Sequence, residues 1–204
     1  MDVSKLIFSQ QKLVFNYNPF GGLRQEEIRD TIIPHFDLDK MRTTITSKEV
    51  SLIQFLGKKG RGKTTHLIHL HQFFPSAPLI LLDRNPNLSF LDDLPDDLLF
   101  IDSIHHIPLI RRIKLFKKTN TVIFSTHVSR SLEASIAAKE IMTIHFKGIT
   151  AERLTKILRQ RIQQSLRESN QVFDLDQKMV QRLIKRFGDD YRGILNYLFD
   201  EFQT

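Results

Sequence analysis

The most constraining feature of this sequence is a short glycine-rich segment between an apolar run and a helical pattern. Residues 57–64 read GKKGRGKT: a glycine, four residues, and then Gly-Lys-Thr. Glycines let successive backbone N–H groups turn toward phosphate oxygens, where a side chain would block the approach. The helix that follows adds the positive end of its dipole. The segment therefore predicts a nucleotide phosphate site, the alternative being a basic turn that matches by chance.

The expected phosphate contacts cover the whole segment and the residue after it: Gly57, Lys58, Lys59, Gly60, Arg61, Gly62, Lys63, Thr64 and Thr65. Two of these residues carry side-chain chemistry of their own. We expect Lys63 to reach the β- and γ-phosphates of the nucleotide, and the hydroxyl of Thr64 to help hold Mg²⁺.

Between residues 50 and 146, short apolar runs alternate with segments of helical periodicity. The runs are nearly continuous, as in strands that are buried on both faces of a parallel sheet. We expect an α/β fold of the P-loop NTPase type, with a five-stranded parallel sheet and helices on both faces. The expected strands are 50–56, 79–82, 98–101, 121–124 and 141–146, and the expected helices are 63–74, 107–118 and 130–139. The acidic stretch 84–97 is typical of a surface loop with little regular structure.

The chain changes character after Gly148, where strand patterns stop and helical patterns continue. The expected helices cover residues 150–166, 174–187 and 191–202. Thr150 is the expected cap of the first helix, and Asp174 that of the second. The sequence thus predicts two domains: a nucleotide-binding α/β domain over residues 1–149 and a small all-α lid over residues 150–204.

Two aspartates close apolar runs and are candidates for holding the metal. Asp102 ends the run LLFID, and Asp83 ends the run LILLD. A carboxylate at a strand end can hold Mg²⁺ through its water shell. Spacing alone does not separate the two, but we favour Asp102 because its pattern is fuller and its strand is flanked by breaks on both sides. Either aspartate could instead cap the next helix.

The composition is that of a folded, basic protein. The 204 residues carry a formal net charge of +7, and the pI is about 9.7. The basic stretch RRIKLFKK (111–118) and the arginines and lysines of the lid could grip DNA or RNA phosphates, or form a solvated face. Without cysteine there is no disulfide or thiolate metal site. No apolar run has the length of a signal peptide or a membrane span, so we expect a cytoplasmic protein with no membrane partner.

Together these features resemble the AAA+ ATPases, in particular the compact origin-recognition and clamp-loader-like branch. The resemblance covers the chain from about residue 50 to its end. It rests on the glycine-rich segment as Walker A, on Asp102 as Walker B, on the strand end FSTH (124–127) and on the lid stretch RFGDDYRGILNYL (186–198). It implies ATP or ADP with Mg²⁺ as cofactors, and either further copies of the chain or a protein partner.

The resemblance also implies roles for polar residues near the γ-phosphate. In that family the strand after Walker B lies between the two Walker strands, so Ser125 or Thr126 would face the γ-phosphate or its attacking water as a first sensor. Arg192, delivered from the lid, would bind the γ-phosphate as a second sensor. One extra residue lies between the Gly-Asp turn and this arginine, so the match is approximate.

The N-terminal stretch NYNPFGGLRQEEIRD (16–30) stands where the family places the segment that covers the adenine. Asn18, Pro19 and Phe20 are the residues expected to make that contact. Core packing is the alternative for Phe20.

Two departures from the family pattern bear on hydrolysis. Most members follow the Walker B aspartate with a glutamate that activates water, whereas here the next residue is Ser103, a poor proton acceptor near neutral pH. His105, His106 and His127 are the nearby imidazoles that could substitute for it. The arginine finger before the fifth strand is missing, and Arg130 is the nearest stand-in.

Three functions stay open at this point. The leading one is an ATPase that hydrolyses ATP slowly and couples it to lid or subunit rearrangement, with action on nucleic acid left open. The second is a non-hydrolysing, ATP-dependent switch that binds a protein. The third is a P-loop kinase, against which the terminal helices and the polar strand end argue.

Overall fold

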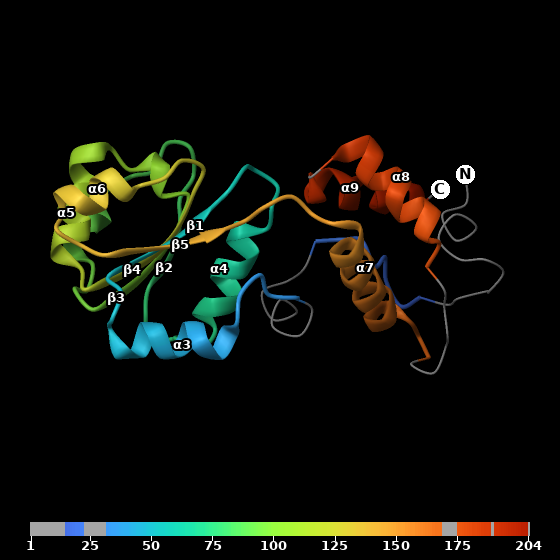
Figure 1. The fold of residues 1–204 in the computed structure, drawn as a ribbon, viewed down its shortest axis with the longest axis horizontal. Coiled ribbons are helices and arrows are strands. Elements are labelled where there is room, and N and C mark those ends of the chain that lie inside the picture. The colour runs from blue at the N-terminus through green and yellow to red at the C-terminus, as the bar shows by residue number, and fades with distance from the viewer. Residues whose placement is uncertain (1–14, 23–31, 169–174, 189, 204) are drawn as a thin grey trace. The chain divides into compact units, whose positions relative to one another are not determined.

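The chain folds as two compact units, one a sheet with helices and the other a set of helices (Figure 1). The computed structural model describes residues 15–22, 32–168, 175–188 and 190–203. One unit is Pro34–Phe146, and the other combines Met1–Ile33 with Lys147–Thr204. The boundary after Phe146 lies close to the expected one at residue 149, but the described N-terminal residues 15–22 group with the C-terminal helices.

The first unit is built around five parallel strands joined in the order β2-β3-β4-β1-β5. The strands are β1 (Leu52–Leu56), β2 (Leu79–Leu81), β3 (Leu98–Asp102), β4 (Thr121–Thr126) and β5 (Ile141–His145). β4 pairs with β1 on one side and with β3 on the other. The expected position of this strand, between the strand before the glycine-rich loop and the strand that ends in Asp102, is therefore confirmed.

Helices cover both faces of this sheet. The helices of the unit are α3 (Leu38–Ser47), α4 (Lys63–His71), α5 (Leu109–Lys118) and α6 (Ser131–Ile136). Because side chains alternate along a strand, neighbouring residues contribute to opposite faces. Phe100 and Ile123 share a buried cluster with residues of α3 and α4. Val122 and Phe124 share another with residues of α5 and α6. The predicted parallel sheet with helices on both faces is thus confirmed.

Two segments of this unit differ from the expectation. α3 was not expected from the sequence. Its hydrophobic periodicity is weak, because Met41 and Ile45 are its only buried residues. Asp37 caps it through its side chain. The acidic stretch 84–97 is not wholly irregular, since Ser89–Asp93 form a 3₁₀ helix.

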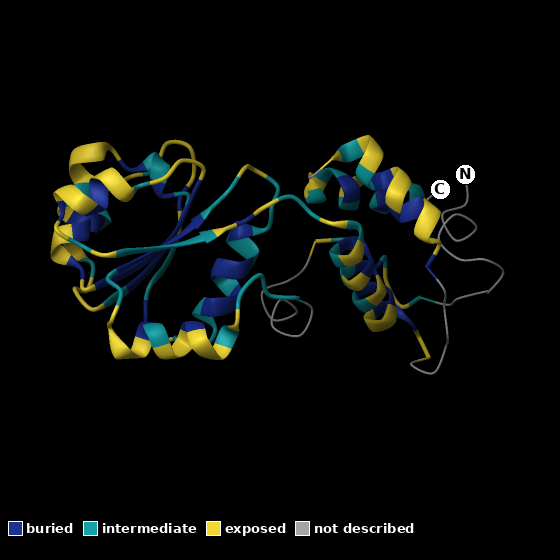
Figure 2. Cartoon of the chain, viewed as in Figure 1, coloured by how far each residue is buried: buried dark blue, intermediate teal, exposed yellow. Residues whose placement is uncertain are grey.

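The second unit is helical, and its buried residues form one core (Figure 2). Its helices are α7 (Ala151–Ser165), α8 (Gln177–Phe187) and α9 (Tyr191–Gln203). Thr150 caps α7 as expected, by accepting a hydrogen bond from the backbone N–H of Arg153 at 3.2 Å. The cap of α8 is Asp176, and the predicted cap Asp174 lies outside the described residues. No helix among the described residues is both long and apolar enough to cross a membrane.

Residues 18–20 of the N-terminal stretch contact this helical core. Phe20 is only 3% exposed and belongs to the same cluster as the buried residues of α7, α8 and α9. Arg161 donates a hydrogen bond to the backbone oxygen of Pro19 at 2.7 Å, and Asn18 donates one to that of Phe199 at 3.1 Å. Of the two alternatives for Phe20, the geometry favours core packing over an adenine contact.

Candidate nucleotide site

The glycine-rich loop joins the end of β1 to the first residue of α4. Gly60 and Gly62 have φ angles of 82° and 78°, a region that residues with a Cβ rarely adopt. Gly57 is needed for a different reason, because a Cβ there would lie 2.6 Å from the backbone oxygen of Phe146. Each glycine of the motif thus meets a steric requirement. The loop leads into a helix N-terminus, where the first N–H groups have no intrahelical partner and favour anions.

The other loop residues differ in how firmly they are held. Lys58 and Lys59 are exposed. Arg61 donates a hydrogen bond to the backbone oxygen of Phe146 at 3.0 Å, which braces the loop against the residue that follows β5. Thr65 is partly exposed in the first turn of α4.

Lys63 is buried inside the loop, with 6% of its surface exposed. Its Nζ donates a hydrogen bond to the backbone oxygen of Lys58 at 2.7 Å and lies 3.4 Å from Nδ1 of His127. The same Nδ1 lies 2.9 Å from the backbone oxygen of Gly57. The ammonium group is therefore held within the loop, where a phosphate oxygen would be a stronger acceptor than a carbonyl.

Asp102 is the carboxylate that meets the loop. The hydroxyl of Thr64 lies 2.9 and 3.0 Å from its two oxygens, and the hydroxyl of Ser125 donates a hydrogen bond to Oδ1 at 2.5 Å. Asp102 is 8% exposed. Asp83, by contrast, is exposed just beyond the edge strand β2. Of the two aspartates that spacing could not separate, only Asp102 forms a described contact with the loop helix.

Successive side chains of β4 point to opposite faces of the sheet, so the two candidate sensor hydroxyls lie on different faces. Ser125 lies on the same face as α4, beside Asp102. Thr126 is on the other face, where its hydroxyl donates a hydrogen bond to the backbone oxygen of Val128 at 2.9 Å and accepts one from Nε of Arg130 at 3.3 Å. The side chain after β4 that lies next to Lys63 is instead His127, which the sequence pattern suggested only as a proton acceptor.

Ser103, which follows the Walker B-type aspartate, has a left-handed backbone with φ 59° and ψ 45°. Its backbone N–H donates a hydrogen bond to the hydroxyl of Ser125 at 2.8 Å. Its own hydroxyl donates one to Oδ2 of Asp102 at 3.2 Å. Residue 103 therefore borders the carboxylate that would hold the metal, but offers no carboxylate of its own.

Three histidines lie together beyond the ends of β3 and β4. The ring of His105 lies 4.2 Å from that of His106 and 4.8 Å from that of His127, measured between centroids. Burial, followed by the positive charges of His106, His127 and Arg130, outweighs the effect of Asp102 and lowers the pKa of His105 from 6.5 to about 4. Its Nδ1 is buried and has no hydrogen-bond partner among the described residues. His105 is therefore a neutral imidazole near pH 7.

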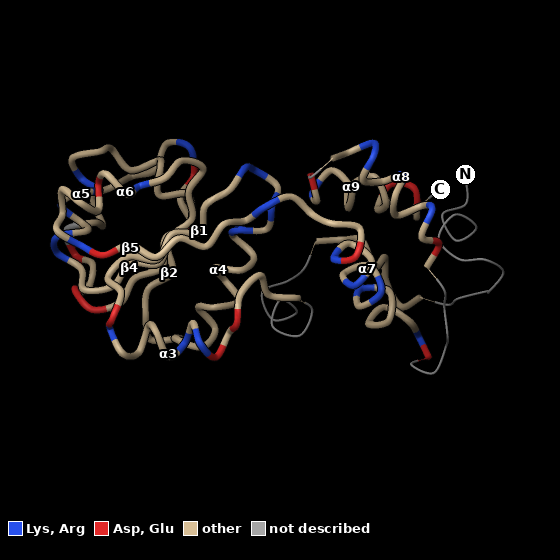
Figure 3. Tube along the Cα trace, viewed as in Figure 1, with Lys and Arg blue, Asp and Glu red and all other residues tan. Residues whose placement is uncertain are grey.

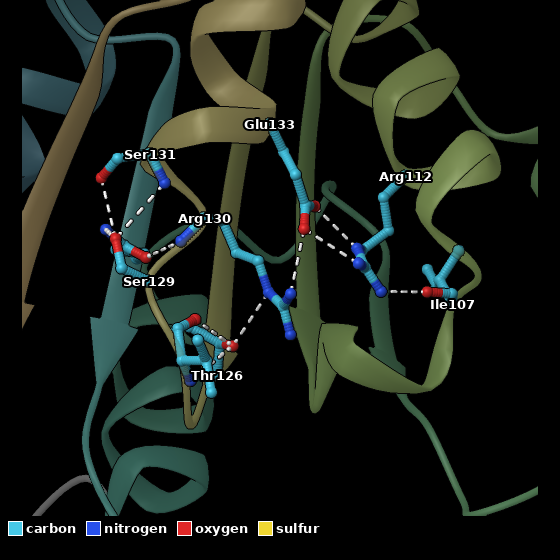
Figure 4. Close-up of polar contacts among 9 residues, drawn as sticks. Ile107, Arg112, Thr126, Ser129, Arg130, Ser131 and Glu133 are labelled. Atoms are coloured by element: carbon cyan, nitrogen blue, oxygen red, sulfur yellow. Dashed lines mark hydrogen bonds and ion pairs between the residues drawn. The ribbon is translucent and has the colours of Figure 1, made fainter.

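A buried ion network occupies the opposite face of the sheet (Figure 4). Glu133 of α6 accepts hydrogen bonds from Arg112 of α5 at 2.7 and 2.9 Å and from Arg130 at 2.9 Å. Arg112 also donates a hydrogen bond to the backbone oxygen of Ile107, and Arg130 one to the hydroxyl of Thr126. Burial disfavours the charge of Glu133, but the two arginines outweigh burial and lower its pKa. Arg130 is therefore engaged within its own chain, which argues against its use as an arginine finger.

Arg192, the predicted second sensor, lies in the first turn of α9 in the helical unit. Its side chain is exposed. Asp190 caps this helix by accepting a hydrogen bond from the backbone N–H of Gly193 at 3.1 Å. Residue 189 of the predicted Gly-Asp turn lies outside the described residues, and the role of Arg192 stays a prediction.

The loop, the carboxylate and the strand order define a P-loop nucleotide-binding fold. Two solved structures have a similar fold over most of this chain. The ORC1 protein of Aeropyrum pernix in complex with DNA matches with a TM-score of 0.62 and 15% identity, over 94% of this chain and 64% of that one. A DNA replication initiation factor matches with a TM-score of 0.55 and 13% identity, over 86% of this chain and 65% of that one.

This chain spans slightly less than two thirds of the length of these two structures. No protein-family model matches the sequence, and no curated protein sequence matches it. At 13–15% identity the likeness shows the fold. The function of the site is inferred from its own residues.

We expect Gly57→Ala to destabilise the first unit, because the new methyl group would lie 2.6 Å from a backbone oxygen. Overpacking of this kind costs about 1–3 kcal/mol. Denaturant unfolding measures the loss. Gly22→Ala is the matched control, since nothing lies within 4 Å of a Cβ at that position. Equal effects of the two changes would contradict the close approach at Gly57.

We expect Glu133→Gln to lower the free energy of unfolding by about 3–5 kcal/mol at pH 7, because it leaves buried guanidinium groups without their counter-charge. The lowered pKa of Glu133 means that its contribution is present above the ordinary value of 4.5 and is lost as pH falls through the folded value. The difference from the wild type should therefore shrink in acid. Glu152→Gln, which breaks an exposed pair with Lys156, is the control and should change little. A difference for Glu133→Gln that is independent of pH would rule out the ionic explanation.

Proposed function

We propose that this chain binds ATP or ADP together with Mg²⁺ and acts as a slow AAA+-type ATPase, whose two units change arrangement with the bound nucleotide. The observation that carries the proposal is the approach of the Thr64 hydroxyl to the Asp102 carboxylate at 2.9 Å. This contact joins the end of a phosphate-type loop to a buried carboxylate at a strand end. Phosphoryl transfer in P-loop proteins needs these two groups on one metal.

The residues present fit a nucleotide with Mg²⁺. The backbone N–H groups of the loop and of the start of α4 would bind the phosphates, and Lys63 would exchange a carbonyl for a phosphate oxygen. Thr64 and Asp102 offer the oxygen atoms that Mg²⁺ prefers. Within the described part of the chain, no group of three or more His, Cys, Asp or Glu side chains could hold a metal. That suits Mg²⁺, which takes one or two protein ligands and completes its shell with phosphate and water. When bound, the ion would neutralise charge on the phosphates.

The polar residues around the γ-phosphate position would divide the remaining work. Ser125 would hold Asp102 in place, and Thr126 would support the loop after β4 from the other face. His127, 3.4 Å from Nζ of Lys63, is the group best placed to contact the γ-phosphate. Arg192 would bind that phosphate from the helical unit and so link its presence to the position of that unit.

A second function, a non-hydrolysing ATP-dependent switch that binds a protein, is favoured by two observations. Ser103 stands where a catalytic glutamate is expected and already donates a hydrogen bond to Asp102. Arg130, the nearest stand-in for an arginine finger, is bound to Glu133. Both would slow hydrolysis without weakening nucleotide binding. No contact among the described residues favours the kinase alternative.

DNA is a candidate partner. One of the similar structures, the Aeropyrum pernix ORC1 protein, is a complex with DNA. For this chain, the support is a net charge of +7 and the exposed Arg182, Lys185 and Arg186 of α8. Phosphate contacts of this kind give an affinity that falls steeply with salt.

We expect Lys63→Ala to abolish binding of ATP with Mg²⁺, because no other side chain of the loop places its charge inside the phosphate cradle. Isothermal calorimetry measures the affinity, and circular dichroism checks the fold. Lys59→Ala, in the same loop but exposed, should keep its affinity. Affinity like that of the wild type in Lys63→Ala would overturn the proposed nucleotide site.

We expect Asp102→Asn to weaken Mg²⁺-dependent ATP binding on the order of 10–100-fold, as loss of a group that supports a metal typically does. Asp83→Asn should leave it unchanged, since Asp83 is exposed beyond the edge strand. Titrations of ATP with and without Mg²⁺ separate the metal effect from general damage. The reverse order of the two variants would mean that Asp83 is the metal-holding residue.

We expect Ser103→Glu to raise ATP turnover, because a carboxylate next to Asp102 supplies the missing proton acceptor. A general base typically contributes about 10²–10⁴-fold, so a visible gain should survive imperfect geometry at this left-handed position. Ser103→Gln, of similar size but unable to accept the proton, is the control. Phosphate release under saturating ATP is the measurement. A fall in turnover with affinity retained would refute the idea that residue 103 faces the attacking water.

A further inference from the structure

The outer surface of α5 and α6 is unusually apolar. Among the described residues, seven large hydrophobic side chains are exposed, and five of them lie between residues 109 and 136: Leu109, Ile110, Val128, Leu132 and Ile136. Ile110 is 70% exposed and Leu132 is 75% exposed. Single exposed apolar residues need no explanation, but a concentration of them marks an interaction site. Val128 lies in the loop before α6; we call the other four residues, together with Lys114 and Lys117, the α5–α6 surface.

The neighbours of α5 show which of its sides faces outward. Leu115 and Phe116 are buried toward the sheet. On one flank, Arg111 and Lys118 donate hydrogen bonds to backbone oxygens of the loop before β3, at 3.4 and 3.1 Å. On the other flank, Arg112 binds α6 through Glu133. Successive residues of a helix are 100° apart. The side of α5 that faces neither the sheet nor these neighbours carries four exposed residues: Leu109, Ile110, Lys114 and Lys117.

The same reasoning orients α6. Glu133 points to α5, and the buried Ala134 and Ala137 contact the sheet cluster. Leu132 and Ile136, four residues apart, therefore share the side of α6 that faces away from the sheet, next to the side that meets α5. The exposed apolar side chains thus lie on two helices that are in contact and are joined by the buried Arg112–Glu133 pair.

The charge of this surface has one sign. Glu133 is the only acidic residue between positions 103 and 139, and it is buried and paired with two arginines. Lys114 and Lys117 are exposed, and neither forms an ion pair with a described residue. Figure 3 shows basic positions along α5. A complementary partner must therefore present apolar and acidic side chains together.

We infer that the α5–α6 surface binds an acidic, amphipathic segment of another protein. Its apolar side chains would cover Ile110, Leu132 and Ile136, and its carboxylates would meet Lys114 and Lys117. The rise of a helix puts Ile110 and Lys117 about 10 Å apart along α5, so the segment should carry its acids one to two helical turns from its apolar anchors. This inference does not depend on nucleotide binding.

Two other occupants fit the surface less well. A second copy of the chain paired through the same surface would set Lys114 and Lys117 against their own equivalents, in a protein that already carries a net charge of +7. An anionic bilayer favours amphipathic helices that carry Lys and Arg along their polar face. Here the lysines lie toward one end of α5 only, while the outer face of α6 carries no basic residue.

The test uses the whole chain and a fluorescein-labelled helical peptide, with leucines spaced to share one face and glutamates one to two turns beyond them. We expect saturable binding in fluorescence anisotropy, and at least tenfold weaker binding at about 1 M salt, where the screening length falls to about 3 Å. A peptide with lysine in place of each glutamate should not bind. Equal binding of the two peptides, or no binding of the acidic one, would overturn the proposal.

Paired variants locate the contact. Leu132→Ser with Ile136→Ser, and separately Lys114→Glu with Lys117→Glu, should each weaken peptide binding at least about tenfold, which corresponds to about 1.4 kcal/mol. The matched controls are Leu81→Ser, at another exposed leucine, and Arg182→Glu with Lys185→Glu, which reverses two charges at the same spacing on α8. Loss of binding in the controls but not in the α5–α6 variants would refute the assignment.

Two further measurements exclude the other occupants. Light scattering of the wild type should show no self-association that Leu132→Ser with Ile136→Ser removes. Vesicles of anionic phospholipid should not compete with the peptide. Either a dimer that depends on these residues or displacement of the peptide by vesicles would replace the proposed protein partner with the corresponding occupant.

Discussion

The candidate site depends on one buried carboxylate, Asp102. A carboxylate removed from water must be surrounded by hydrogen-bond donors or it is too costly to keep charged. Here the donors come from three places in the chain: Thr64 at the start of α4, Ser125 at the end of β4, and the neighbouring Ser103. Because β4 lies between β1 and β3, the ends of these strands meet at one point. Satisfying Asp102 therefore fixes the phosphate loop relative to the centre of the sheet.

The loops beyond β3 and β4 are held from the other face as well. The guanidinium of Arg112 joins Ile107, which follows the histidine pair, to Glu133 on α6. Arg130 joins the same carboxylate to Thr126 at the end of β4. The histidines between these anchor points are thus placed by two polar networks, one on each face. Such a buried network orders its surroundings only while every member is paired.

The ion network also lies directly beneath the outer surface of α5 and α6. Glu133 stands between Leu132 and Ala134, so one helical turn carries an exposed leucine, a buried carboxylate and a buried alanine. The two helices carry exposed apolar side chains on their outer side and contact the loops after β3 and β4 on their inner side. The proposed protein-contact surface and the loops that border the phosphate site therefore share one pair of helices. The two proposed functions, a slow ATPase and a non-hydrolysing switch, differ in the role of Ser103. For the slow ATPase this serine replaces a catalytic residue, and for the switch it has a structural role.

The sequence by itself determined the features that rest on local sterics and periodicity. The glycine spacing indicated the phosphate loop, because each glycine meets a backbone requirement that no other residue satisfies easily. Continuous apolar runs indicated the parallel strands, and Thr150 indicated the start of α7. Only the tertiary structure shows which aspartate contacts the loop helix, which faces of the sheet Ser125 and Thr126 take, and whether Arg130 is paired. Those choices depend on strand order, on the face a side chain takes, and on partners as far as 38 residues away in the chain, none of which a local pattern records.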